Sequence, residues 1–162
     1  MNLPPVIVNL RKLILRIAGA LGWLAPLLAR LTVGITFIGT GWGKLHTLPD
    51  VTQFFASLHI PAPHFNAILA SSAEFFCGAA LLFGVLTRLA AIPLIVTMIV
   101  AITTAKIIPG KVEGLTDFVG AEEWIYIVIF VWLAVAGPGA ASIDRLLARL
   151  FKLDAPKSTQ LA

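Results

Sequence analysis

The stretch LAAIPLIVTMIVAITTAKII, residues 89–108, contains twenty residues, of which only Lys106 is charged. A helix of about 20 apolar residues is long enough to cross the hydrocarbon core of a bilayer, so this stretch predicts a membrane span. A transmembrane β-barrel would alternate apolar and polar residues, and the later run IYIVIFVWL at 125–133 shows no alternation. We therefore predict an all-α membrane protein with spans over about 21–45, 66–86, 89–108 and 120–136.

Composition supports the same class of protein. The chain has 162 residues, of which 59% are hydrophobic and 12% are charged, whereas a soluble domain carries about 25% charged residues. A soluble domain of this size could not bury so much apolar surface. The single cysteine, Cys77, excludes an internal disulfide. The net charge of +4 comes from basic residues at the ends of apolar stretches, which indicates contact with lipid headgroups and not with nucleic acid.

The distribution of basic residues predicts the orientation in the membrane. Cytoplasmic loops carry an excess of Lys and Arg. With Arg30 left out as intramembrane, we expect both termini in the cytoplasm and four helices in an up-down-up-down bundle. The inner side would hold Arg11, Lys12, Arg16, Arg88, Arg145, Arg149, Lys152 and Lys157, and the outer side Lys44, Lys106 and Lys111.

Amphipathic segments flank the predicted spans. Apolar residues recur every three or four positions over residues 6–20 and again over 142–152, with basic residues on the opposite face, which is typical of helices that lie in the membrane interface. A cleaved signal peptide is the rival interpretation of the first segment, although Arg16 would interrupt its apolar core. We expect one transmembrane domain over 1–152 and a flexible tail over 153–162.

Glu74 lies within the second predicted span, where a charge costs at least about 2.5 kcal/mol. Such a residue faces the bundle interior and finds a partner, so we expect a cluster with Lys44, Lys106 or both near the outer side. Three interpretations remain open: an ion pair that sets helix register, a ligand, proton or quinone site, or a water-filled vestibule.

Arg30 enters the first span near its cytoplasmic third. We expect its side chain to snorkel to the inner headgroups; the alternative is a partner such as Asp144, a lipid or a quinone headgroup. The stretch 34–43 contains four glycines and Trp42. Glycines let helices approach closely, so helix packing is the first interpretation and a cofactor groove the second.

Histidines are concentrated in the first outer loop, at His46, His59 and His64. Histidine is the commonest metal ligand, which makes a metal site a candidate here. However, their spacings of 13 and 5 match no familiar zinc pattern. The chain also shows no phosphate loop, dinucleotide fingerprint or nucleophile elbow.

Several short motifs follow one another along most of the chain. They are Arg30–Gly34, Phe37 and Gly41–Lys44, then Ile60–Pro63, Glu74, Gly78, Leu82, Gly84, Thr87–Arg88 and Ala90–Ala91, and finally Gly137–Gly139 and Ser142–Asp144. In this order the motifs resemble those of the DoxX family. The resemblance implies a four-helix membrane protein, with Arg30, Lys44 and Glu74 as the positions carried over. Named members of that family are subunits of thiosulfate:quinone oxidoreductase or partners of thiol-stress and superoxide-handling proteins.

These features lead to a functional hypothesis. We expect an accessory or quinone-interacting subunit of a redox or oxidative-stress system in the bacterial inner (plasma) membrane. It would be an oxidoreductase subunit and not a self-contained enzyme, with a protein partner or a second copy beside it in the bilayer. The alternative is a non-enzymatic assembly, stress-protection or metal-handling protein that binds a partner through its outer loops. The ligand-binding candidates are Arg30, Trp42, Lys44, Glu74 and Lys106.

Overall fold

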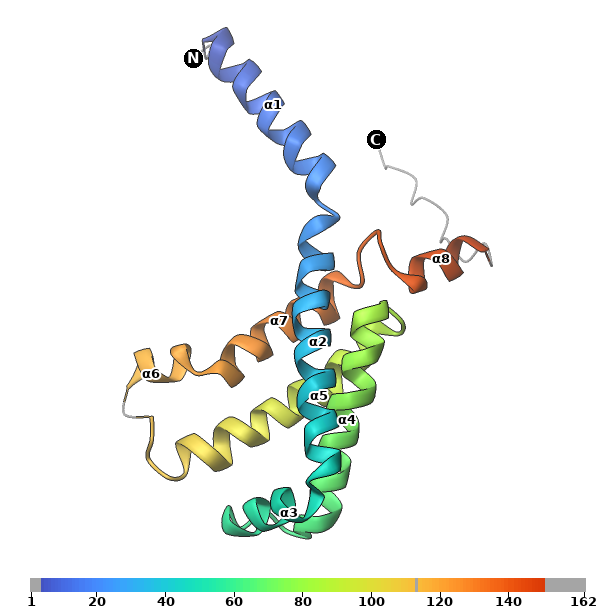
Figure 1. Ribbon diagram of the computed structural model, residues 1–162. Coiled ribbons are helices and arrows are strands. Elements are labelled where there is room, and N and C mark those ends of the chain that lie inside the picture. Colours follow the sequence, from blue (N-terminus) through green and yellow to red (C-terminus); the bar gives the residue numbers. More distant parts are fainter. Residues whose placement is uncertain (1–3, 113, 151–162) are drawn as a thin grey trace, which may run out of the picture.

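The computed structural model describes residues 4–112 and 114–150, and all regular structure within them is helical (Figure 1). Three helical segments are long and apolar enough to cross a membrane, namely Val6–His46, Pro63–Phe83 and Thr87–Ile107. The chain is therefore a membrane protein. The helices are α1 (Pro5–Leu21), α2 (Leu24–His46), α3 (Leu48–Ser57), α4 (Pro63–Phe83), α5 (Thr87–Ile102), the π-helix η1 (Thr103–Ile107), α6 (Leu115–Gly120), α7 (Glu122–Ala136) and α8 (Ile143–Leu150).

The predicted spans correspond to observed helices with shifts of a few residues at their ends. The first three match α2, α4 and the continuous α5–η1 segment. The fourth is shorter than expected, because Ala121 adopts an extended conformation and separates α6 from the 15 residues of α7. Helix α3 was not predicted, and it forms within the connection that was expected to be an outer loop.

Helices α2 and α4 pack along their lengths as one layer, and glycines allow the close approach. A Cβ atom on Gly34 would lie 2.9 Å from Leu82 Cα, and one on Gly78 would lie 2.9 Å from Ile38 N. Only part of the glycine-rich stretch serves this purpose, since a Cβ atom on Gly39 or Gly43 would meet no described residue of another helix within 4 Å. Close helix packing is thus confirmed for some of these glycines and not for the others.

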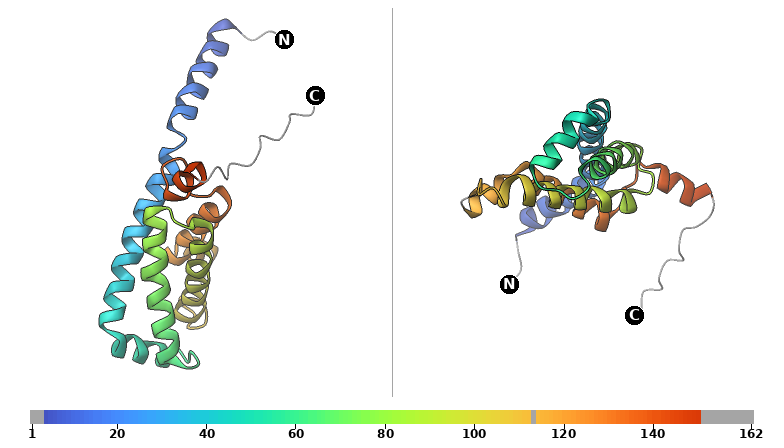
Figure 2. Two further views of the ribbon diagram at one scale, coloured as in Figure 1. Left: turned by 90° about the vertical axis from the view of Figure 1, so that its right-hand side faces the viewer. Right: turned by 90° about the horizontal axis from the view of Figure 1, so that it is seen from below.

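Helices α5 and α7 form a second pair that lies against the first and is inclined to it (Figures 1 and 2). Apolar side chains fill the space between the layers. Phe37 of α2 meets Tyr126 and Phe130 of α7 edge-on, with ring centroids 5.1 and 5.0 Å apart. The all-helical class is therefore confirmed, whereas the up-down-up-down bundle stays a prediction. The buried core is Val33, Phe37, Leu81, Ala90, Ala91, Leu94, Met98, Phe130 and Leu133.

The amphipathic helices at both ends are present, but they stand apart from this core. Helix α1 runs on from α2 and projects away from the two layers (Figure 2), and its described side chains are exposed except for the half-buried Val8. Helix α8 has polar and apolar faces as predicted. The end of the predicted second interfacial helix and the tail at 153–162 lie outside the described residues.

Candidate functional site

Two charged side chains are buried in the part of the chain that the structure describes. Arg30 of α2 is 2% exposed and Glu74 of α4 is 1% exposed. Both lie in the α2–α4 pair, but Arg30 is near the end where α4 finishes and Glu74 is nearer the end that carries Lys44. A buried charge is costly unless it is paired or hydrogen-bonded, so the partners of each decide what it can do.

Arg30 donates hydrogen bonds to four backbone carbonyls. The acceptors are Leu81 O at 2.9 Å and Leu82 O at 3.1 Å, near the end of α4, and Pro138 O at 2.6 Å and Ala141 O at 2.8 Å, in the segment after α7. The last carbonyls of a helix have no partner within it, which is why this site attracts a cation. The expectation that Arg30 snorkels to the headgroups was therefore wrong.

Asp144 completes the set of contacts around Arg30, the Arg30 cluster, through the backbone. Its carboxylate accepts hydrogen bonds from Leu86 N at 2.8 Å and Thr87 N at 3.2 Å, where α5 begins, and its own N–H donates to Gly84 O at 3.0 Å. Gly84 has a φ of +68°, and a Cβ there would lie 2.5 Å from Arg30 Nη2. The cluster therefore ties the first turn of α8 to the α4–α5 turn.

Glu74 forms an ion pair with Lys44, as the sequence predicted for one of its two candidate lysines. The distance from Lys44 Nζ to Glu74 Oε1 is 2.6 Å, and the lysine side chain is 38% exposed. The other carboxylate oxygen, Oε2, is buried and accepts no hydrogen bond from any residue that the structure describes. Half of this carboxylate is thus unsatisfied.

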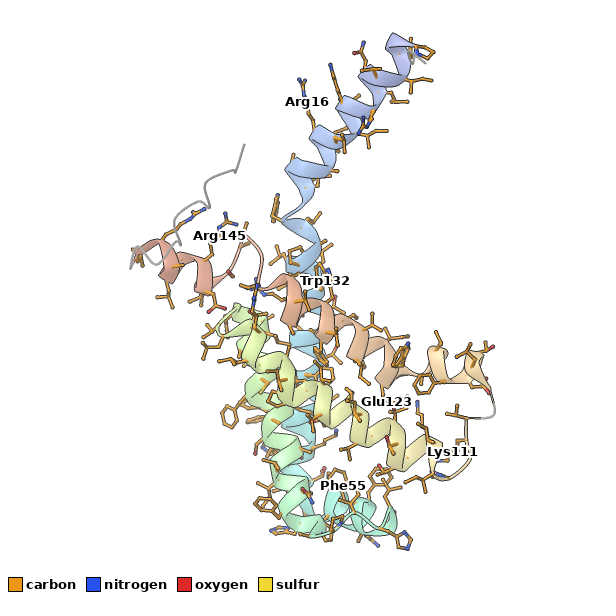
Figure 3. The ribbon with its side chains drawn as sticks, turned by 180° about the vertical axis from the view of Figure 1, so that it is seen from behind. Arg16, Phe55, Lys111, Glu123, Trp132 and Arg145 are labelled. Atoms are coloured by element: carbon orange, nitrogen blue, oxygen red, sulfur yellow. The ribbon has the colours of Figure 1, made fainter. Side chains whose placement is uncertain are left out.

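Lys106, the other lysine considered as a partner of Glu74, pairs with a different acid. Its Nζ lies 2.6 Å from Oε2 of Glu123, in the first turn of α7 (Figure 3). Lys106 belongs to η1, and α5 packs chiefly against α7. Such π-turns alter the direction of side chains within a helix and are frequent at functional sites. Because α5 and α7 pack together as a pair inclined to α2 and α4, Lys106 pairs with Glu123 and not with Glu74.

A cavity of about 290 Å³, the polar groove, lies between the two helix pairs. Its lining combines charged and hydroxyl side chains with a few apolar ones. Thr36 and Thr40 donate their hydroxyl hydrogens to Thr32 O at 2.9 Å and Phe37 O at 3.3 Å, so their oxygens remain as acceptors. The complete lining is Thr36, Phe37, Thr40, Lys44, Glu74, Met98, Ala101, Glu122, Glu123 and Tyr126.

Several groove residues were missed in the sequence. Thr36 and Thr40 precede Lys44 at intervals of four, which places all three on one face of α2, and this spacing could have indicated them. Glu122, Glu123 and Tyr126 gave no comparable signal, because they line the groove only through the packing of α7 against the other pair.

The remaining candidates lie away from the groove. Trp42 is 56% exposed, and its ring centroid is 4.2 Å from that of His46 and 5.6 Å from that of Phe75. His64 Nδ1 lies 3.4 Å from Thr52 Oγ1. Among the described residues, no three His, Cys, Asp or Glu side chains are grouped so that they could hold a metal ion. The geometry therefore gives the three loop histidines no common site.

The sequence pattern of the DoxX family matches residues 25–107. The chain belongs to the DoxX family. The matched segment contains Arg30, Lys44 and Glu74 and ends at the close of η1. The α7 wall of the polar groove, with Glu122, Glu123 and Tyr126, therefore lies beyond the match.

Relatives of this DoxX-family chain include two that are named as membrane proteins and one that is named as a putative oxidoreductase. The uncharacterised membrane protein Rv3486 of Mycobacterium tuberculosis is 35% identical over 74% of this chain and 79% of its own length. The inner membrane protein YqjF of Escherichia coli is 35% identical over 75% of this chain and 90% of its own. The putative oxidoreductase CatD of Bacillus subtilis is 28% identical over 75% and 85%. No solved structure matches the chain.

Proposed function

We propose that this DoxX-family protein is an inner-membrane accessory subunit of a redox system and that its polar groove binds a quinone headgroup. The observation that carries the proposal is the Glu74 carboxylate, buried at the groove with one oxygen unsatisfied by any described residue. Buried polar groups are normally paired. A ligand that supplies the missing partner would explain why this carboxylate is retained there.

The lining of the groove suits a small polar ring. Lys44 and Tyr126 carry hydrogen-bond donors, while Phe37 and Met98 provide apolar contact. Its volume of about 290 Å³ is near the lower end of the roughly 300–1,000 Å³ that is usual for ligand cavities. This volume favours a ligand whose ring enters the groove while its apolar tail stays in the lipid.

The relatives support a redox role at the level of their names. CatD is called a putative oxidoreductase, and YqjF is called an inner membrane protein. This chain has no cofactor motif and only one cysteine, the half-buried Cys77. We therefore assign it the role of an oxidoreductase subunit that binds the quinone beside a partner that carries the redox group.

The proposal includes four crossings within one domain over residues 1–152, with both termini in the cytoplasm. Helix α7 is about 22 Å long at about 1.5 Å per residue, so it would cross together with part of α6 or at a thinned bilayer. Helices α1 and α8 would lie in the inner interface.

In a Cys77→Ser background, Arg16→Cys and Arg145→Cys should react with an impermeant thiol reagent only in inverted vesicles, and Asp50→Cys only in intact cells.

Titration of the reconstituted protein with a short-tailed quinone analogue tests the binding role. Saturable binding of the reduced, hydroxyl-bearing form of the analogue is expected, and Glu74→Gln should weaken it, because an amide nitrogen in place of Oε2 cannot accept the hydroxyl hydrogen. Asp50→Asn is the matched control, since Asp50 is exposed on α3 outside the groove. Absence of binding, or equal binding by wild type and Glu74→Gln, would refute the proposed function.

A second candidate is an assembly or stress-protection factor that binds a partner at the outer surface. Two observations favour it: helix α3 forms in the first outer connection, and a cavity of about 450 Å³ lies beside the second, lined by residues such as Lys106, Lys111 and Thr116. A partner that co-purifies with wild type and is lost when residues 47–62 are replaced by a flexible linker would support this role.

A further inference from the structure

The unsatisfied oxygen of Glu74 has a definite chemical requirement. Oε1 of Glu74 forms the ion pair with Lys44, at 2.6 Å from Nζ. An ionised carboxylate only accepts hydrogen bonds. Oε2 is buried without a partner among the described residues, so the atom that would satisfy it must be a hydrogen-bond donor.

The groove as a whole has more acceptors than donors. The hydroxyl hydrogens of Thr36 and Thr40 are already bonded to backbone carbonyls, and Glu122 and Glu123 add carboxylate oxygens to the wall. An acceptor placed among these oxygens would meet like partial charges. A donor placed there would find several partners.

We propose that the polar groove discriminates between the redox forms of its ligand and binds the hydroxyl-bearing quinol more tightly than the carbonyl-bearing quinone. This inference rests on the proposed function and adds to it. A quinol hydroxyl donates to Glu74 Oε2, whereas a quinone carbonyl offers only lone pairs to the same carboxylate. A charge-assisted hydrogen bond is roughly twice as strong as a neutral one, so its loss has a large effect.

Lys44 can donate to the same hydroxyl from which Glu74 accepts. Its ammonium has three N–H donors and uses one on Glu74. The remaining donors can reach a ligand oxygen, because Lys44 lines the same groove and is partly exposed. The pair thus presents an acceptor and a donor side by side, which fits a hydroxyl that both donates and accepts better than a carbonyl that only accepts.

The test compares three ligands that share one ring and one short tail. The full-length protein in lipid nanodiscs is titrated calorimetrically and without oxygen with decylubiquinol, decylubiquinone and the dimethyl ether of the quinol. We expect the quinol to bind at least about tenfold more tightly than the other two, the factor that one such hydrogen bond produces. The dimethyl ether keeps the shape of the quinol and lacks its donors.

The Glu74→Gln variant should lose this preference, because its amide can donate to the quinone carbonyl. Asp50→Asn should keep it. Equal affinities of wild type for quinol and quinone would overturn the inference and leave the proposed function intact, as would equal affinities for quinol and its dimethyl ether. If none of the three ligands binds, the proposed function fails as well. The ether comparison uses wild type alone, so it holds even if Glu74→Gln does not fold.

Discussion

Arg30 and Glu74 are both almost completely buried in the same helix pair, yet their surroundings differ. Arg30 donates four hydrogen bonds to backbone carbonyls of two separate segments. Glu74 has one ion pair, to a lysine that is partly exposed, and one oxygen without a partner among the described residues. Burial of a charge is therefore a poor guide to function, whereas the set of its partners separates a structural site from a binding site.

The chemical nature of those partners differs. The acceptors around Arg30 are backbone carbonyls at the end of α4 and in the segment between α7 and α8. Lys44, in contrast, ends in a long side chain that can turn toward a ligand. The Arg30 cluster is thus closed by main-chain groups, and the polar groove retains a place for an additional group.

Replacement of the buried Arg30 is expected to have the largest effect on stability. Arg30→Leu removes one donor from each of four carbonyls, of which Leu81 O still accepts from Gly84 N at 3.1 Å, and breaking such a buried charged network costs about 3–5 kcal/mol. We expect a large fall in the melting temperature in detergent. Arg145→Leu is the control, since Arg145 is an exposed residue of α8 (Figure 3). Equal melting temperatures for the two variants would contradict the structural role of Arg30.

Adding a methyl group where α2 and α4 approach most closely should have an intermediate effect. A methyl group on Gly41 would collide with the backbone of Phe75, next to Glu74, so Gly41→Ala should separate the helices and widen the Lys44–Glu74 pair. Overpacking of this kind costs about 1–3 kcal/mol. Gly39→Ala is the matched control because its methyl group enters open space. Thermal unfolding of both variants measures the effect, and similar destabilisation by both would show that the contact is not tight.

The second ion pair should matter least for stability. Lys106 and Glu123 are both partly exposed, with side-chain exposures of 33% and 19%, and pairs that solvent reaches contribute about 0–1 kcal/mol. We expect Glu123→Gln to change the melting temperature only slightly, far less than Arg30→Leu does. A loss comparable to that of Arg30→Leu would mean that the α5–α7 pair depends on this contact.

Much of the fold could be predicted from local sequence. Each membrane span is a property of its own segment, because the transfer of about 20 apolar residues into lipid does not depend on distant residues. The positions of α2, α4 and α5–η1 were therefore predicted to within a few residues. The ion pair of Glu74 with Lys44 followed from the cost of an isolated charge in the membrane, and the motifs that resemble the DoxX family lie largely in the same segments.

The partners of the charged residues depended on tertiary structure. Lys106 was matched by depth to Glu74, but the inclination of the α5–α7 pair and the π-turn at 103–107 bring it to Glu123. Arg30 was expected to reach the headgroups, but the chain returns after α7 and offers it carbonyls. Sequence alone thus determined which segments are long and apolar enough to cross a membrane. The angle between the helix pairs, set by side chains far apart in sequence, decided which charges meet and where the polar groove lies.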